Sequence, residues 1–184
     1  MDLMKSEEYT VDDIYALPEG TRAELIDGRW YDMAAPGSFH QAIVIAIAGE
    51  MRNHIKNKGG KCRVFPSPVA VFLNKDNRNY LEPDIIVVCD EEKIDERGCN
   101  GAPDLVVEIV SPSSKKIDYG IKLFKYRMSG VREYWIINPD MKTINTYIFS
   151  KDEEKEEANQ LGFDEELTSS VLPGFSIVLS EELM

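Results

Sequence analysis

Hydrophobic residues follow two different periods along this chain, and each period predicts a kind of element. Within residues 39–56 they recur every three or four positions, the spacing of one helix face, at Val44, Ile47, Met51 and Ile55. Lys58-Gly59-Gly60 predicts the end of this helix. A second helix is expected after residue 114 and is ended by Gly130, with an apolar stripe made of Ile117, Ile121, Phe124 and Met128.

Shorter apolar runs, bounded by Gly, Pro, Asn or Asp, predict strands. Residues 22–26 and 29–33 flank Asp27-Gly28, a strong hairpin signal, and a short helix capped by Thr10 precedes them. Two central runs follow Asp84 and Asp104. Further strands are expected at residues 62–65, 69–73, 133–138 and 143–149, with one or two more in 167–179. The acidic segment after residue 149 is expected to be a solvated loop.

Together these elements predict an α/β fold, in which a mixed β-sheet is flanked by helices and carries an N-terminal hairpin extension. At 184 residues the chain is expected to form a single domain over residues 1–184, with residues 1–8 disordered.

Two carboxylates interrupt the central strands and suggest chemistry. Glu108 lies between Val107 and Ile109 in a run otherwise suited to burial, and a lone buried charge costs several kcal/mol unless it is paired or bound to a cation. Asp84 opens the other run. Asp104 is roughly 13 Å along the strand from Glu108, too far to share one ion, and is expected to cap the strand entrance. Asp84 and Glu108 therefore predict a site for Mg²⁺ or Mn²⁺.

Composition limits the class of protein. A hydrophobic content of 43%, with no run long enough for a membrane helix, indicates a water-soluble protein without a membrane partner. The amino terminus has no apolar core of a signal peptide, and the three cysteines form no Cys-x-x-Cys pair. We therefore expect no disulfide framework, no zinc site and a cytoplasmic location.

The net charge of −12 argues against a protein that coats nucleic acid without sequence specificity, because such binding depends on Lys and Arg. The acids are unevenly placed, however. Six basic residues stand against two acidic ones in residues 115–133, whereas two lysines face eight acids in residues 151–166. A phosphate-containing substrate is therefore compatible with the central part of the chain.

Several motifs resemble the Uma-two family of restriction endonucleases, within the PD-(D/E)XK nuclease superfamily. The resemblance covers nearly the whole chain from residue 9 onward, and its main runs are Glu24-Leu25-Ile26-Asp27-Gly28, Glu82-Pro83-Asp84, Ala102-Pro103-Asp104-Leu105-Val106-Val107-Glu108, Ser111-Pro112-Ser113 and Leu172-Pro173-Gly174. It implies a restriction-endonuclease-like fold with Asp84 and Glu108 as the motif acids. The superfamily lysine position, two residues after the second acid, holds Val110, and the family's lysine corresponds instead to Lys122.

Each candidate has an alternative interpretation. Glu108 could be salt-bridged to a lysine at a strand edge, and Asp84 could simply begin a strand. Lys122 could form an exposed helical ion pair with Asp118, four residues before it. The resemblance suggests Glu24 as a further acid near the ion, although a residue beside the hairpin turn could face solvent. His40 lies on the apolar stripe of the first helix, which favours packing, but it could face the active site from the helix start.

The sequence thus predicts a metal-dependent endonuclease that hydrolyses nucleic acid, with DNA as the expected substrate, through metal-activated water. Lys115, Lys116 and Lys125 are expected to contact the phosphate backbone from wetter faces of the second helix. Cleavage of a duplex favours a homodimer, with Tyr134-Trp135 and Tyr147-Ile148-Phe149 as interface candidates. The alternative is a catalytically degenerate nuclease fold that acts as a binding or assembly module, favoured by the acidic charge and Val110.

Overall fold

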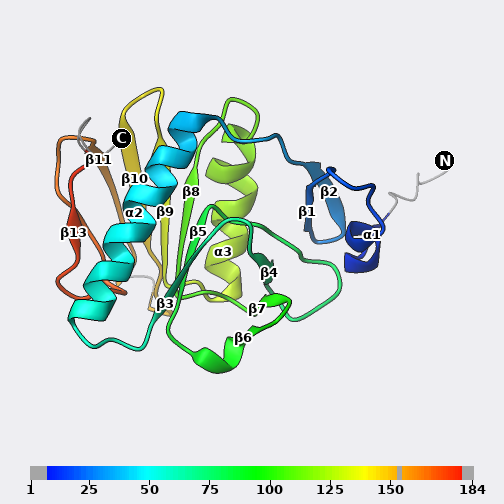
Figure 1. The fold of residues 1–184 in the computed structure, drawn as a ribbon, viewed down its shortest axis with the longest axis horizontal. Coiled ribbons are helices and arrows are strands. Elements are labelled where there is room, and N and C mark those ends of the chain that lie inside the picture. Colours follow the sequence, from blue (N-terminus) through cyan, green and yellow to red (C-terminus); the bar gives the residue numbers. More distant parts are fainter. Residues whose placement is uncertain (1–7, 153–154, 180–184) are drawn as a thin grey trace.

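A six-stranded mixed sheet forms the centre of the protein, which a computed structural model describes for residues 8–152 and 155–179 (Figure 1). The predicted disorder of residues 1–8 concerns a segment of which 1–7 lie outside the described residues. The strand order is β11-β10-β9-β8-β5-β3, and β8 and β9 run parallel whereas the other neighbours are antiparallel. The strands are β3 (Arg63–Pro66), β5 (Ile85–Val88), β8 (Leu105–Ile109), β9 (Glu133–Asn138), β10 (Thr143–Ile148) and β11 (Glu157–Gly162).

Helices cover both faces of this sheet, so the predicted mixed sheet with flanking helices is confirmed. Helix α2 (Ser38–Asn57) lies along one face, and its predicted stripe of Val44, Ile47, Met51 and Ile55 is buried. The other face is covered by η2 (Ile117–Lys122), one stretch of π-helix, which continues into α3 (Leu123–Ser129). Because side chains alternate along a strand, Val107 packs toward α2 while Val106 packs toward α3.

The N-terminal hairpin is present where the sequence predicts it. Strands β1 (Ala23–Ile26) and β2 (Arg29–Asp32) pair antiparallel, and Asp27 and Gly28 take positive φ angles of 51° and 76°, as a tight two-residue turn requires. Leu25 and Tyr80 exchange backbone hydrogen bonds of 2.7 and 2.8 Å, which attach the hairpin to the segment before β5. The short capped helix α1 (Val11–Tyr15) precedes it.

Smaller elements complete the fold. The 3₁₀ turn η1 (Glu91–Lys93) leads into a three-stranded sheet, and the predicted terminal strands pair with each other. The strands concerned are β4 (Ala70–Phe72), β6 (Ile94–Asp95), β7 (Gly98–Asn100), β12 (Leu167–Thr168) and β13 (Ser176–Ile177). The predicted loop after residue 149 is wrong for β11, which pairs with β10 along its length. An edge strand needs backbone partners but few apolar side chains, and residues 157–160 are exposed.

The predicted apolar stripe of the second helix is wrong. Ile121, Phe124 and Met128 are 41%, 64% and 65% exposed, and the buried residues of this helix are Asp118, Lys122, Lys125 and Tyr126. The side of the helix that faces the sheet meets carboxylates rather than a purely apolar surface, so a charged face is the one that is buried. The π turn lies in the segment that carries Asp118 and Lys122, and such turns are frequent at functional sites.

Cysteine pairing also differs from the expectation. Cys62 and Cys89 form a disulfide, while Cys99 is free and buried. The two cysteines flank a cross-strand pair, since Cys62 precedes Arg63 of β3 and Cys89 follows Val88 of β5. The pairing of these strands therefore brings the cysteines together, and no local sequence motif predicts the bond. The missing pairing motif is one reason for expecting a cytoplasmic protein, and that location stays a prediction.

Two further observations bear on partners. Tyr134 and Trp135 are fully buried, which removes them as interface residues because their side chains fill the core on opposite faces of β9. Across residues 8–152 and 155–179, no helix has the length and apolar character that crossing a membrane requires.

Glu133 anchors the last part of the chain to the sheet. Its side chain is buried at the start of β9, and its Oε2 atom accepts hydrogen bonds of 2.9 Å from the Ser169 hydroxyl, the Ser170 amide and hydroxyl, and the Val171 amide. The Oε1 atom accepts from the Trp135 indole at 2.7 Å. All these partners are donors, so an ionised carboxylate satisfies them together.

Replacing this anchor should cost stability. Glu133→Gln places an amide group against donors, so at least one buried hydrogen bond is lost and the free energy of unfolding should fall by about 1–3 kcal/mol. Urea unfolding followed by circular dichroism measures the change. Glu166→Gln, at an exposed position of the same terminal segment, is the control and should stay within about 0.5 kcal/mol of the parent. Equal stability of Glu133→Gln and the parent contradicts the anchoring role.

Candidate active site

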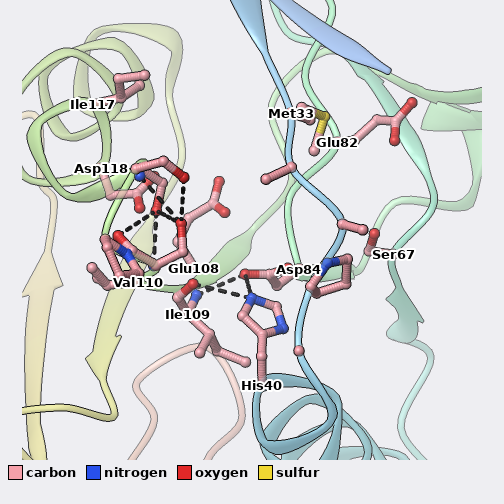
Figure 2. A pocket seen from close by; sticks show the side chains of 18 of the residues that line it. Met33, His40, Ser67, Glu82, Asp84, Glu108, Ile109, Val110, Ile117 and Asp118 are labelled. Carbon is pink, nitrogen blue, oxygen red and sulfur yellow. Dashed lines mark hydrogen bonds and ion pairs between the residues drawn. The ribbon is translucent and has the colours of Figure 1, made fainter. Parts of the chain in front are cut away.

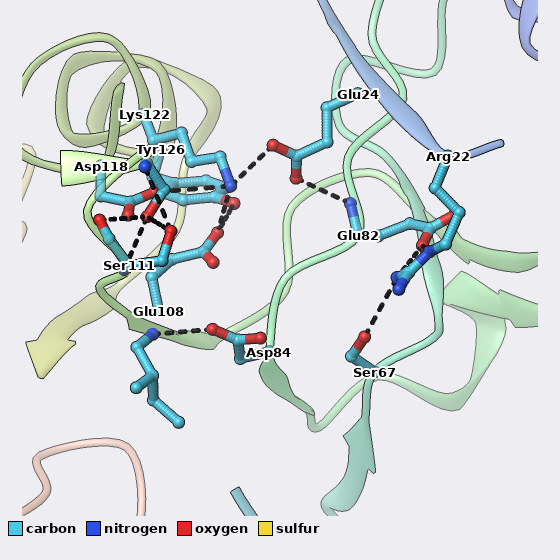
Figure 3. Close-up of polar contacts among 12 residues, drawn as sticks. Arg22, Glu24, Ser67, Glu82, Asp84, Glu108, Ser111, Asp118, Lys122 and Tyr126 are labelled. Atoms are coloured by element: carbon cyan, nitrogen blue, oxygen red, sulfur yellow. Dashed lines mark hydrogen bonds and ion pairs between the residues drawn. The ribbon is translucent and has the colours of Figure 1, made fainter. Parts of the chain in front are cut away.

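Asp84 and Glu108 come together where β5 and β8 pair. Ile85 pairs with Val107, so continuing the antiparallel register by one residue places Asp84 opposite Glu108 on the face that bears α3. Asp84 Oδ2 accepts a 2.7 Å hydrogen bond from the Ile109 amide, which ties this carboxylate to β8. The sheet therefore positions the two predicted acids next to each other (Figure 3).

Lys122 reaches these acids from the helix. Its Nζ atom lies 2.8 Å from Glu24 Oε2, 2.9 Å from Glu108 Oε1 and 3.6 Å from Asp118 Oδ1, and its side chain is 5% exposed. The alternative of an exposed helical pair with Asp118 is wrong, because the ammonium is buried among three carboxylates. Glu24 does not face solvent either: its side chain is 6% exposed, and its Oε1 atom accepts a 3.0 Å hydrogen bond from the Glu82 amide.

Burial and charge shift the pKa values of this cluster. Burial raises the pKa of Glu108 well above its usual range; the charge of Lys122 opposes this, and the neighbouring acids reinforce it. Burial raises the pKa of Asp118 in the same way. For Lys122, burial alone would lower the pKa, but Glu108, Glu24 and Asp118 outweigh it and hold the pKa well above its ordinary value. Lys122 is therefore a cation at neutral pH, and its single positive charge lies among three carboxyl groups.

Tyrosines and a serine turn complete the cluster. Tyr126 donates a 2.8 Å hydrogen bond to Glu108 Oε1, and Tyr134 donates to the Asp118 carbonyl at 3.2 Å. Ser111 and Ser114 hydrogen-bond each other at the start of the helix, as expected of a turn. Sequence reasoning missed Tyr126 and the buried role of Asp118. Their spacing of four residues on either side of Lys122 is the signal that could have identified them.

His40 contacts Asp84 from the start of α2. Its Nε2 atom is 3.2 Å from Asp84 Oδ2 and 3.1 Å from the Ile109 carbonyl (Figure 2). Burial lowers the pKa of His40, but the hydrogen bond and the charge of Asp84 outweigh this effect, so the pKa is raised overall. His40 thus faces the site rather than only packing on the sheet, and it holds the orientation of the Asp84 carboxylate.

The three predicted backbone lysines separate into two groups. Lys115 and Lys116 are exposed and directly follow Ser114, which lines the cavity described below. Lys125, expected on a wetter face, is buried instead, and its ammonium forms an ion pair with Asp27 of the hairpin turn. The expected exposure of Lys125 is wrong because the hairpin covers this part of the helix.

A cavity of about 480 Å³ opens beside these residues. Glu108 and Asp118 lie on one side in Figure 2, and Glu82 and Ser67 on the other, with Asp84 and His40 between them. The described lining residues include one arginine and one lysine, Arg22 and Lys122, against seven acidic side chains: Glu24, Asp32, Glu82, Asp84, Glu108, Asp118 and Asp140. A polyanion could enter this cavity only if further positive charge offset these acids.

The donor set fits a hard divalent cation with water as additional ligand. Asp84 Oδ2 and Glu108 Oε1 are engaged, whereas Asp84 Oδ1 and Glu108 Oε2 accept no hydrogen bond from the described residues. No group of three or more His, Cys, Asp or Glu in the described ranges is arranged to hold a metal ion. Mg²⁺ is commonly bound by one or two carboxylates together with water and substrate phosphate, so two free oxygens are sufficient.

Known proteins similar to this chain bear on its family and fold. Uncharacterized protein slr1290 of Synechocystis sp. is 28% identical over 125 residues, which cover 67% of this chain and 64% of that protein, so this chain spans less than two thirds of the relative's length. A crystal structure from Anabaena variabilis, described as "a putative nuclease belonging to DUF820", has a TM-score of 0.73 and covers 95% of this chain and 96% of that one. At 22% identity, this likeness shows that the two chains share a fold.

A family model gives the assignment. The Uma2 model, described as "Putative restriction endonuclease", matches residues 11–180 of the 184. This range contains the hairpin acid Glu24, both central acids and Lys122. The protein therefore belongs to the Uma2 family.

Proposed function

We propose that this protein is a Mg²⁺- or Mn²⁺-dependent endonuclease that hydrolyses phosphodiester bonds in nucleic acid, with DNA as its substrate. One observation carries the proposal: Lys122 Nζ lies 2.9 Å from Glu108 at the wall of an acidic cavity. The pairing of β5 with β8 places Asp84 beside Glu108 at the same wall. Such a group of perturbed, buried ionisable residues in a cavity is typical of an active site.

Asp84 and Glu108 would hold the divalent cation through their free carboxylate oxygens. When bound, such a cation lowers the pKa of coordinated water and neutralises charge that develops on the phosphoryl group. It would also offset the surplus of carboxylates in the cavity, which otherwise repels a phosphate.

The chain's own residues position and stabilise. Lys122 keeps its proton and presents a positive charge next to Glu108, where it would stabilise negative charge in the transition state. Glu24 and Asp118 fix the ammonium from two further directions, and Tyr126 fixes Glu108. His40 and the Ile109 amide hold Asp84 Oδ2, which leaves Oδ1 directed to other partners.

The location of the lysine weighs against the degenerate-module alternative. Val110, at the superfamily's lysine position, is buried and packs with Val106 and Tyr126 in the core under α3. A lysine from the helix nevertheless lies beside the second acid. A chain that had only kept the scaffold would have little reason to bury a cation and three carboxylates, because their desolvation opposes stability.

The proposal extends to partners and location. Two-fold symmetry supplies one active site for each strand of a duplex, so we include a homodimer. Of the aromatic residues predicted for the dimer interface, Tyr147 and Phe149 are only partly buried and stay candidates for it. A cytoplasmic location, where the nucleic acid lies, is also part of the proposal.

A cleavage assay tests the proposed activity. Labelled single- and double-stranded DNA and RNA are incubated with the protein and Mn²⁺ or Mg²⁺, beside Asp84→Asn. We expect cleavage of DNA by the parent and at least a 100-fold lower rate for Asp84→Asn, because the variant lacks one of the two acids that would hold the cation. Asp164→Asn, at an exposed position in the turn after β11, is the control and should cut like the parent. An inactive parent, or a fully active Asp84→Asn, contradicts the proposal.

Lys122→Met separates catalysis from charge pairing. Loss of a transition-state contact should lower the rate at saturating substrate by about 10²–10³-fold. Because Lys122 is buried with three carboxylates, the single variant should also lose about 3–5 kcal/mol of stability. We therefore pair it with Lys122→Met/Glu24→Gln, in which one negative charge is removed together with the lysine.

The two readouts give different outcomes for the two roles. If Lys122 acts in catalysis, the double variant should melt closer to the parent yet cut as slowly as Lys122→Met. Lys115→Met, on the exposed start of the helix, should mainly raise the substrate concentration required. Recovery of cleavage in the stabilised double variant would show that Lys122 serves folding alone.

A further inference from the structure

Arg22 stands on the wall of the cavity away from the Lys122 cluster. Figure 3 shows its guanidinium beside Glu82 and Ser67, with the Glu24 carboxylate between this group and Lys122. Arg22 directly precedes β1, and its carbonyl accepts a 3.0 Å hydrogen bond from the Met33 amide, which closes the open end of the hairpin. The hairpin thus contributes both Glu24 and Arg22 to the cavity.

Glu82 and Ser67 hold the Arg22 guanidinium in place, but some of its N–H donors have no acceptor among the described residues. Its Nε and Nη2 atoms donate to Glu82 Oε2, and Nη2 also lies 3.4 Å from Ser67 Oγ. A guanidinium carries five N–H donors, and no described residue accepts from the two on Nη1. The Arg22 side chain is 36% exposed and lines the cavity, whereas the Glu82 side chain is 11% exposed.

Ser67 and Glu82 fix this arginine relative to the candidate catalytic acids. The Ser67 amide donates a 2.8 Å hydrogen bond to the Asp84 carbonyl, and Glu82 is two residues before Asp84. The second oxygen of Glu82 accepts a 2.7 Å hydrogen bond from the Tyr80 hydroxyl. Since Ser67 Oγ accepts from Arg22, its own hydroxyl proton remains available to an anion.

Lys122 cannot serve the same purpose. Its ammonium is 5% exposed and surrounded by Glu24, Glu108 and Asp118. Of the arginine and lysine side chains that line the cavity in the described residues, Arg22 is thus the one with donors available to an incoming anion. The geometry of a guanidinium edge with an adjacent hydroxyl suits the oxygens of a phosphate group.

From this arrangement we infer that Arg22 and Ser67 form a phosphate-binding subsite, which holds an internal phosphate of the nucleic-acid strand other than the phosphate under attack. The inference rests on the proposed function for the identity of the ligand. It assigns Arg22 a role in binding and in fixing the register of the strand against Asp84 and Glu108.

Binding measurements without cleavage test this subsite. Fluorescence anisotropy with a labelled oligonucleotide in Ca²⁺ is measured from 50 to 200 mM salt for the parent, Arg22→Met, Ser67→Ala and Arg29→Met. Arg29 is exposed on the neighbouring β2 and does not line the cavity, so its variant is the matched control. The affinity of the parent should fall as salt rises from 50 to 200 mM. Because Arg22→Met lacks one phosphate contact, the factor by which its affinity falls over this range should be about threefold smaller. Ser67→Ala should weaken binding without this change in salt dependence.

A second variant excludes a purely structural ion pair. Arg22→Met/Glu82→Gln removes both charges, so it should melt near the parent while binding as weakly as Arg22→Met. Parental binding by this double variant, or by Arg22→Met itself, overturns the subsite.

Oligonucleotides with a 5′-hydroxyl or a 5′-phosphate then distinguish the source of the phosphate. The effect of Arg22→Met should be equal for both, and an effect confined to the 5′-phosphate overturns the assignment to an internal phosphate. If the parent cuts DNA but Arg22→Met binds and cuts like it, the subsite fails and the nuclease proposal stands. If nothing is cut but the salt dependence changes as expected, the subsite stands and the nuclease proposal fails.

Discussion

The ion-pair cluster around Lys122 is the interaction on which the arrangement of the cavity depends. One ammonium joins Glu24 of the hairpin, Glu108 of the central sheet and Asp118 of the helix, so three structural elements meet at a single nitrogen atom. Taking these charges out of water opposes folding, and it is tolerated only because each has a close partner. Tyr126 adds a hydrogen bond to Glu108 and secures the carboxylate from the helix side.

The hairpin gains its importance from this cluster. Backbone hydrogen bonds between Leu25 and Tyr80 attach it to the core, and the Lys125–Asp27 ion pair attaches its turn to the helix. With the hairpin in place, Glu24 contacts Lys122, and Arg22 lines the same cavity. The cavity is therefore enclosed by residues that an isolated sheet and its two helices would not provide, and its charge is set by the hairpin as much as by the central strands.

The sequence predicted those features that depend on local pattern. Alternation and helical periodicity identified the central strands, α2 and the hairpin, and a carboxylate inside an apolar strand correctly indicated that Glu108 has a close charged partner. The stripe of Ile121, Phe124 and Met128 failed because apolar character was equated with burial, whereas this helix buries its charged face. Two other features depend on contacts between strands and loops distant in sequence: the Cys62–Cys89 disulfide and the position of Arg22 beside Ser67. A single sequence shows no local pattern that predicts such contacts.

We propose that the carboxylates beside Lys122 bind a divalent cation. Thermal unfolding of the parent and Asp84→Asn, each with EDTA and with saturating Mn²⁺, measures this binding without a substrate. Binding to the folded state at a hundred times the dissociation constant adds about 2.7 kcal/mol, which for a chain of this size raises the melting temperature by roughly 5–11 °C. We expect this rise for the parent, a much smaller one for Asp84→Asn, and no loss of stability of that variant in EDTA, because its repulsion with Glu108 is relieved. An equal rise in both proteins, or none in the parent, would contradict the proposal.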